Sequence, residues 1–287
     1  MSQGMFVVRS IHAVREAVGA ARRAGATIGF VPTMGAFHDG HLSLMRRARA
    51  ECGFVVVSVF VNPTQFNEAK DFEGYPRDEG RDAAMARGEG VDLLFAPTPE
   101  VMYPAGFATM VELSGVTEPL EGAQRGPLHF RGVATVVSKL FNIVQPDVAY
   151  FGQKDAQQAL VVRRMVQDLD FPVRVAVCPT VREPDGLAMS SRNVRLSPEE
   201  RGQALALKRG LDAAAAVIAS GARDRASVER AGTAAMRAAG VTPEYFAAVD
   251  ASTLQPAEVV RGELLLAVAA RVGPVRLIDN LLLTVPA

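Results

Sequence analysis

The sequence predicts an α/β protein, with a Rossmann-like doubly wound parallel sheet followed by a smaller C-terminal α+β domain. Short apolar runs alternate with amphipathic helical patterns up to about residue 180. One run, residues 54–61 (FVVVSVFV), has the dominantly apolar composition of a strand buried on both faces. Beyond residue 180 the composition shifts to Ala-rich helical stretches and strand-like runs. We therefore expect two domains, 1–180 and 181–287.

The first domain is predicted element by element. Residues 6–8 form a strand, and Ser10 caps a helix that ends at Gly25. The apolar stripe of that helix consists of Ile11, Val14, Val18 and Ala21. The later strands are expected at residues 27–31, 54–61, 91–96, 148–151 and 173–178. The later helices are expected at residues 40–51, 81–88, 133–144 and 156–169.

The second domain begins with a clear helix start. Ser197 is followed by Pro198 at the first helical position and by Glu200, which can reach back to the cap. Helices are expected at residues 199–220 and 226–239, and strands at 245–249, 264–268 and 275–278.

Composition narrows the function classes. The chain has 287 residues, with 31 Lys and Arg against 31 Asp and Glu, so its net charge of zero disfavours nucleic-acid binding. No apolar run approaches the roughly 20 residues of a membrane span, and residues 1–8 do not resemble a signal peptide. Cys52 and Cys178 lack metal-ligand spacing and fit free thiols in a reducing cytosol. We expect a soluble, cytoplasmic protein without membrane contact.

Chemistry is expected in the loops after Val31, Val61, Phe151 and Cys178, because ligands of such sheets bind at the carboxyl ends of the strands. The first of these loops runs into His38 and His41, which share one face of a helix start.

Gly35 in this loop allows close approach of a ligand, and the helix N-terminus suits a phosphate. Two surface histidines beside a turn are the simpler alternative. We favour a functional pair because the chain has only four histidines.

Five segments together resemble a known family. Residues 38–41 (HDGH) match the HIGH-type signature of the nucleotidyltransferase superfamily, and the longer string 32–44 (PTMGAFHDGHLSL) closely resembles the pantoate–β-alanine ligase family. The other four segments are 61–66 (VNPTQF), 75–77 (YPR), 151–158 (FGQKDAQQ) and 189–193 (MSSRN). They occur in the family's order, so the resemblance spans nearly the whole chain.

The resemblance implies an activity. Enzymes of this family convert ATP and pantoate into pantoyl adenylate and pyrophosphate, and β-alanine then displaces AMP to give pantothenate. The implied cofactor is Mg²⁺ with ATP, without an organic prosthetic group, and the implied assembly is a homodimer. Phosphoryl transfer of this kind depends mainly on positioning and on offsetting negative charge.

The resemblance also assigns residues. Catalytic roles fall on His38, His41, Lys154, Ser190, Ser191 and Arg192. Further ATP contacts fall on Met34, Gly35, Ala36, Phe37, Asp39, Gly40, Gly152, Gln153, Asp155, Val181 and Met189. Pantoate and β-alanine contacts fall on Gln65, Gln158, Asn62 and Phe60, with Phe66 a further candidate, although both phenylalanines also suit a core. Asn62 either contacts the ligand or orients Gln65. Asp82 corresponds to an acidic residue near the magnesium, which is held mainly by the phosphates.

Two departures and two alternatives remain open. Gln153 stands where the family usually has Glu. One extra residue precedes His129, so Arg125, His129 and Arg131 are alternative candidates for a cation at the rim of the site. Another adenylyl-transferring enzyme of the superfamily is the first alternative. A tRNA synthetase is disfavoured by the zero net charge, and a nucleotidyltransferase that keeps AMP in its product is disfavoured by Gln65 and Gln158. A non-catalytic binding protein would be expected to have lost His41, Lys154 or the serine pair, and all are present.

Overall fold

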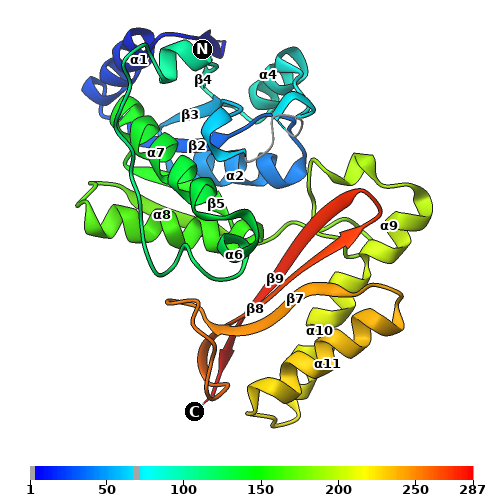
Figure 1. Cartoon of the computed structure of the whole chain (residues 1–287). Coiled ribbons are helices and arrows are strands. Elements are labelled where there is room, and N and C mark those ends of the chain that lie inside the picture. The colour runs from blue at the N-terminus through cyan, green and yellow to red at the C-terminus, as the bar shows by residue number, and fades with distance from the viewer. Residues whose placement is uncertain (1–3, 67–71, 287) are drawn as a thin grey trace. The chain divides into compact units, whose positions relative to one another are not determined.

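The computed structural model describes residues 4–66 and 72–286 (Figure 1). The chain folds into two compact units. The first takes in the chain up to Thr117 together with Arg125–Gly152 and Gln158–Pro179. The second takes in Glu118–Gln124, Gln153–Gln157 and the chain from Thr180 onward. The expectation about the N-terminal segment falls partly on residues 1–3, outside the described residues.

The first unit contains the parallel sheet. Its elements are β1 (Phe6–Val8), α1 (Ile11–Arg23), β2 (Ile28–Thr33), α2 (Asp39–Glu51), β3 (Phe54–Val59), η1 (Pro63–Gln65), α4 (Glu79–Gly88), β4 (Leu93–Phe95), α5 (Pro99–Met102), α7 (Pro127–Val144), β5 (Val148–Gly152) and β6 (Arg174–Cys178). Two helices have residues in both units, α6 (Glu121–Arg125) and α8 (Ala156–Asp168).

The sheet confirms the doubly wound prediction. All its strands pair in parallel, in the order β1-β4-β3-β2-β5-β6. From β2 the chain proceeds outward to β3 and β4 on one side, whereas β5 and β6 lie on the other. The strand order therefore reverses between β2 and β5, where ligands of open α/β sheets bind. The loops after Thr33 and Gly152 follow those two strands.

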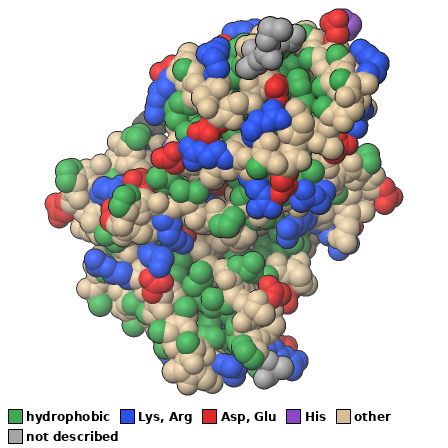
Figure 2. Space-filling model, turned by 180° about the vertical axis from the view of Figure 1, so that it is seen from behind, with side chains coloured by type: hydrophobic (Ala, Val, Ile, Leu, Met, Phe, Trp, Pro, Cys, Tyr) green, Lys and Arg blue, Asp and Glu red, His purple; other side chains and the backbone are tan. Residues whose placement is uncertain are grey.

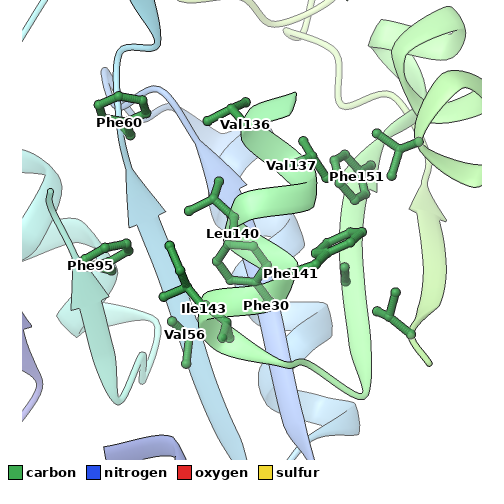
Figure 3. Close-up of a cluster of buried hydrophobic side chains, with 14 of the residues drawn as sticks. Phe30, Val56, Phe60, Phe95, Val136, Val137, Leu140, Phe141, Ile143 and Phe151 are labelled. Atoms are coloured by element: carbon green, nitrogen blue, oxygen red, sulfur yellow. The ribbon is translucent and has the colours of Figure 1, made fainter. Parts of the chain in front are cut away.

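Helices cover both faces of this sheet because successive strand residues point to opposite sides. Phe30 lies in the core beneath α7, and its ring meets that of Phe141 edge-on at 6.4 Å between centroids (Figure 3). The next residue, Val31, packs on the other face with Met45 of α2. Each such buried side chain contributes about 1.5–3 kcal/mol, so the strand ends that carry the loops are firmly held.

The second unit contains an antiparallel sheet and the C-terminal helices. Its remaining elements are η2 (Gln153–Asp155), η3 (Asn193–Arg195), α9 (Pro198–Ala204), α10 (Ala206–Ala219), α11 (Arg225–Ala238), β7 (Pro243–Asp250), β8 (Gly262–Val272) and β9 (Val275–Val285). The strand order is β7-β8-β9. Gly232 lets α11 approach β7 closely, because a Cβ there would lie 2.2 Å from the ring of Phe246.

Most predicted elements are confirmed within a few residues, including the capping box of Ser197 and Glu200. Three predictions were wrong. The strand predicted at 275–278 is β9, which continues to Val285 because it pairs with β8 along its whole length. Helix α7 begins at Pro127, six residues before the predicted start, because Gly126 (φ 75°) turns the chain into a helix with proline at its first position. The single helix predicted at 199–220 is two helices, interrupted at Leu205, whose ψ is −15°.

The distribution of charged side chains on the surface is consistent with the net charge of zero. On the face shown in Figure 2, basic and acidic side chains are interspersed. No helix in the described part of the chain is long and apolar enough to cross a membrane.

Candidate active site

A left-handed turn follows β2 and shapes the start of the site. Gly35 has φ 83° and Ala36 has φ 53°, so both are in the region that favours glycine. The turn is fastened from two directions. Thr33 Oγ1 accepts the Gly35 N–H at 3.1 Å, and the carboxylate of Asp82 accepts the N–H groups of Ala36 and Phe37, each at 2.8 Å.

Asp82 therefore holds the loop. Its side chain is 1% exposed, and burial raises the pKa of its carboxyl although the two backbone hydrogen bonds oppose this. Asp82, which the resemblance places near the magnesium, thus accepts one backbone N–H on each of its carboxylate oxygens. Among the described residues no cluster of three His, Cys, Asp or Glu side chains could hold a metal.

His38 and His41 form a capping box at the start of α2. His38 Nδ1 accepts the Gly40 N–H at 3.1 Å, and His41 Nδ1 accepts the His38 N–H at 3.4 Å. A neutral imidazole has one donor and one acceptor nitrogen. Since both Nδ1 atoms accept, the proton of each neutral ring belongs on Nε2. The rings lie 4.2 Å apart between centroids, so the two donors share the positive end of the helix dipole.

The loop after β3 places two polar residues next to this turn. Asn62 is 1% exposed and caps η1, and its Nδ2 donates to Gln65 Oε1 at 3.1 Å. Gln65 Nε2 lies 3.0 Å from Met34 Sδ, which joins this loop to the one after β2. Phe60 lies in the core, 4% exposed, and Phe66 contacts the ring of Phe72.

The segment 151–158, which the resemblance assigns in part to ATP binding, includes η2, and η2 is anchored to β9. Asn280 Nδ2 donates to the carbonyl oxygens of Gln153 and Lys154 at 3.0 and 2.9 Å, and its Oδ1 accepts from Gln153 Nε2 at 3.0 Å. The Lys154 side chain is 19% exposed and lies 3.7 Å from Asp155. The residue that departs from the family pattern, Gln153, thus makes a specific contact.

The segment that carries the serine pair is anchored to the neighbouring residue of β9. Arg182 forms a two-pronged ion pair with buried Asp279, at 2.7 and 3.0 Å. Across the same turn, the Met189 N–H donates to the Val181 carbonyl at 3.0 Å. The half-buried Ser190 accepts the Arg192 N–H on its hydroxyl at 3.3 Å.

The predicted residues therefore fall into two groups. The first unit brings together those at the carboxyl ends of β2 and β3, namely Met34, Gly35, Ala36, Phe37, His38, Asp39, Gly40, His41, Asn62 and Gln65. Gly152, at the end of β5, and Gln158, half-buried on α8, also belong to this unit. The second unit holds Gln153, Lys154, Asp155, Val181, Met189, Ser190, Ser191 and Arg192.

Sequence reasoning missed several residues that support these groups. Tyr103 donates to Asn62 Oδ1 at 2.8 Å, and Asp279 and Asn280 anchor the second group. An Asp-Asn pair inside an apolar strand is the only sequence signal for the β9 anchors. Two of the three residues that the sequence left as candidates for the cation at the rim of the site are in different places. His129 Nδ1 lies 2.9 Å from the Gln65 carbonyl oxygen, whereas Arg125 is the last residue of α6.

Comparisons with known proteins agree with the earlier resemblance. A family model described as pantoate-beta-alanine ligase matches residues 6–282. The chain is 56% identical to the pantothenate synthetase of Moorella thermoacetica, over 98% of this chain and 99% of that protein. The corresponding protein of Heliobacterium modesticaldum is 54% identical over 97% of this chain and 100% of its own.

Solved structures give the same result. A crystal structure of pantothenate synthetase from Thermus thermophilus has a TM-score of 0.91 at 52% identity, covering 96% of this chain and 99% of that one. A pantoate-beta-alanine ligase from Francisella tularensis, crystallised with beta-gamma ATP and beta-alanine, has a TM-score of 0.78 at 34% identity, covering 97% of each chain.

Proposed function

Because the chain belongs to the pantoate–β-alanine ligase family, we propose that it condenses pantoate with β-alanine at the expense of ATP. The observation that carries the proposal is the pair of imidazoles of His38 and His41 at the start of α2, each accepting a backbone N–H on Nδ1, beside the point where the strand order reverses. Donors at a helix N-terminus suit the phosphates of a nucleotide.

The reaction needs two displacements. A pantoate carboxylate oxygen attacks the α-phosphorus of ATP, the bond to the β-phosphate oxygen breaks, and pyrophosphate leaves. The amine of β-alanine then attacks the acyl carbon, AMP leaves with the electron pair of the broken C–O bond, and the nitrogen loses a proton. Activation is required because a carboxylate and an ammonium form a salt in water, whereas an acyl adenylate has a good leaving group.

In the first step the protein positions the reactants and offsets charge. His38 and His41 donate to phosphate oxygens, where negative charge grows as the bond to pyrophosphate breaks. The remaining loop contacts to ATP come from Met34, Gly35, Ala36, Phe37, Asp39 and Gly40. Mg²⁺ would be held mainly by the ATP phosphates, because it usually takes few protein ligands, with Asp82 as the acidic residue that the resemblance places near it.

The remaining nucleotide contacts are also proposed. Lys154 pairs with phosphate oxygens, and Ser190, Ser191 and Arg192 close over the triphosphate as part of a 181–287 domain. Further ATP contacts come from Gly152 at the end of β5 and from Gln153, Asp155, Val181 and Met189.

The acyl substrate and β-alanine are proposed to bind at the loop after β3. Gln65 and Gln158 orient pantoate, with Asn62 and Phe60 beside them. We also propose a homodimer that works in the cytosol, and the two free thiols of Cys52 and Cys178 fit a reducing compartment.

Isotope exchange between ATP and pyrophosphate tests this proposal. The purified protein should catalyse exchange that requires pantoate and does not require β-alanine. With all three substrates it should release free AMP, whereas an enzyme that keeps AMP in its product would not. Absence of exchange with pantoate and its close analogues would refute the proposal.

A further inference from the structure

The structure assigns a direction to the amide of Gln65. We infer that Asn62 is a positioning residue that holds the Gln65 side-chain oxygen inward, so that Gln65 binds the acyl substrate through its NH₂ group as a hydrogen-bond donor. The identity of that substrate rests on the proposed function, whereas the direction of the amide follows from the hydrogen bonds.

The first step is the orientation of Asn62, which two backbone groups determine. The Thr64 N–H is only a donor, and it lies 3.3 Å from Asn62 Oδ1. The Gly132 carbonyl is only an acceptor, and it lies 3.1 Å from Asn62 Nδ2. Reversing the Asn62 amide would place two donors together at Thr64 and two acceptors together at Gly132. Because the side chain is 1% exposed, water cannot relieve either clash.

Two hydroxyls strengthen this orientation. Tyr103 Oη donates to Asn62 Oδ1 at 2.8 Å, and Thr64 Oγ1 donates to the same oxygen at 3.0 Å. Burial raises the pKa of Tyr103, so its hydroxyl keeps the proton that it donates. Asn62 Oδ1 is thus surrounded by donors.

The second step transfers this direction to Gln65. One Nδ2 hydrogen of Asn62 is used by Gly132, and the other points to Gln65, so Gln65 must present its oxygen at 3.1 Å. Its Nε2 consequently lies on the other side, 3.0 Å from Met34 Sδ. A thioether sulfur is a weak acceptor. A substrate oxygen is a stronger one and would replace it.

Close packing keeps the whole arrangement in place. A Cβ on Gly132 would lie 2.3 Å from the Thr64 carbonyl oxygen, so α7 and η1 touch backbone to backbone. His129 Nδ1 lies 2.9 Å from the Gln65 carbonyl oxygen, which holds the main chain of Gln65 as well.

A donor at this position distinguishes the acceptor groups of the substrates from their donor groups. The Gln65 NH₂ group can donate to a carboxylate or hydroxyl oxygen of pantoate. It cannot accept from the ammonium of β-alanine, which also only donates. The direction of the amide thus excludes a contact with the ammonium of β-alanine and leaves the oxygen atoms of either substrate as acceptors. Because the family resemblance assigns Gln65 to pantoate, we expect it to contribute to the KM for pantoate.

Two substitutions test this inference by steady-state kinetics. Gln65→Glu has nearly the same shape but replaces the donor with an acceptor, and Asn62→Asp removes the NH₂ group that fixes Gln65. Each should raise the KM for pantoate about tenfold or more, the scale of one lost hydrogen bond to a charged group. The KM for ATP should stay within about twofold. Asn142→Asp is the matched control, since the Asn142 amide donates to the Ser138 carbonyl of its own helix and should behave as wild type.

A double-mutant cycle separates positioning from general stability. In a Gln65→Ala background, Asn62→Asp should no longer change the KM for pantoate. An equal effect in both backgrounds, or a wild-type KM for pantoate in Gln65→Glu, would overturn the inference. If Asn62→Asp does not fold, the Gln65→Glu result decides alone. Absence of pantoate-dependent exchange in the wild-type protein would instead refute the proposed function, so the two failures are distinguishable.

Discussion

Buried polar side chains hold the loops in this protein through hydrogen bonds to their backbone groups. Asp82 accepts two backbone N–H groups, and Asn280 donates to two backbone carbonyls. Leaving such a group without a partner costs about 1–3 kcal/mol. These residues therefore act on the site through geometry, and their substitution should alter loop conformation before it alters chemistry.

At His41 the catalytic and structural roles can be separated. His41→Gln should keep the capping box, because Gln is a standard residue at the third helical position, but it removes the imidazole Nε2 donor. We expect kcat to fall by about 10²-fold, the scale of one transition-state donor, with an unchanged Tm. Rapid-quench and steady-state assays measure this effect. A kcat equal to that of the wild type would exclude His41 from the phosphate contacts.

Gln153 should contribute to stability through its contact with Asn280. Its Nε2 donates to Asn280 Oδ1, whose own direction is fixed by two backbone carbonyls. Gln153→Glu would place two acceptors together, so we expect a loss of about 1 kcal/mol in the free energy of unfolding. Urea denaturation at neutral pH measures it, with Gln203→Glu on exposed α9 as the control. Equal stability of the two variants would mean that the Asn280 contact is dispensable.

At the scale of elements, strands and helices could be predicted because their signals are local. The apolar run 54–61 and the stripe of Val14 and Val18 each lie within a few residues. The anchors of the site could not be predicted in the same way. Asn280 lies 126 residues along the chain from Lys154, and no local pattern indicates that they meet. The motif containing His38 could be predicted because its hydrogen bonds join residues only two or three positions apart in the sequence.

The N-terminus of helix α2 lies at the candidate site, and Glu51 at its C-terminal end bonds to neighbouring elements. This carboxylate bonds Arg47 within the helix, Tyr150 of β5 at 2.8 Å and Arg174 of β6 at 2.9 Å. These partners lower the pKa of Glu51 from 4.5 to about 2, with Arg47 the largest cause. The contacts thus tie one helix to two neighbouring strands while the carboxylate is charged.

The lowered pKa makes the stability of this element depend on pH. The folded state favours the ionised carboxylate, so the stabilisation is present above pH 4.5 and is lost as pH falls toward 2. Glu51→Gln should therefore lose less stability than the wild type between about pH 5 and pH 3. Urea unfolding at both values checks this, with Glu258→Gln at an exposed position as the control. Parallel acid dependence in wild type and Glu51→Gln would contradict the prediction.

At the scale of the whole molecule, the residues proposed for the chemistry come from two units that are built differently. The first unit supplies loops at the ends of parallel strands, which the fold class itself predicts to be a binding edge. The second supplies segments fastened to Asp279 and Asn280 on β9. The fold class predicts chemistry after Phe151 and Cys178, where Lys154 and Ser190 follow along the chain, but it carries no expectation that an antiparallel hairpin anchors those segments.

From this division we expect residues of β9 to affect the KM for ATP and kcat without contacting the nucleotide. Lys154→Ala should raise the KM for ATP and lower kcat, since a cation that pairs with phosphate oxygens is lost. Asn280→Ala should change both constants in the same direction, because it releases the backbone of Gln153 and Lys154. In a Lys154→Ala background, Asn280→Ala should have little further effect on the KM for ATP. Lys208→Ala, which removes an exposed ion pair on α10, is the matched control. If the two effects simply add, Asn280 stabilises the second unit without positioning Lys154.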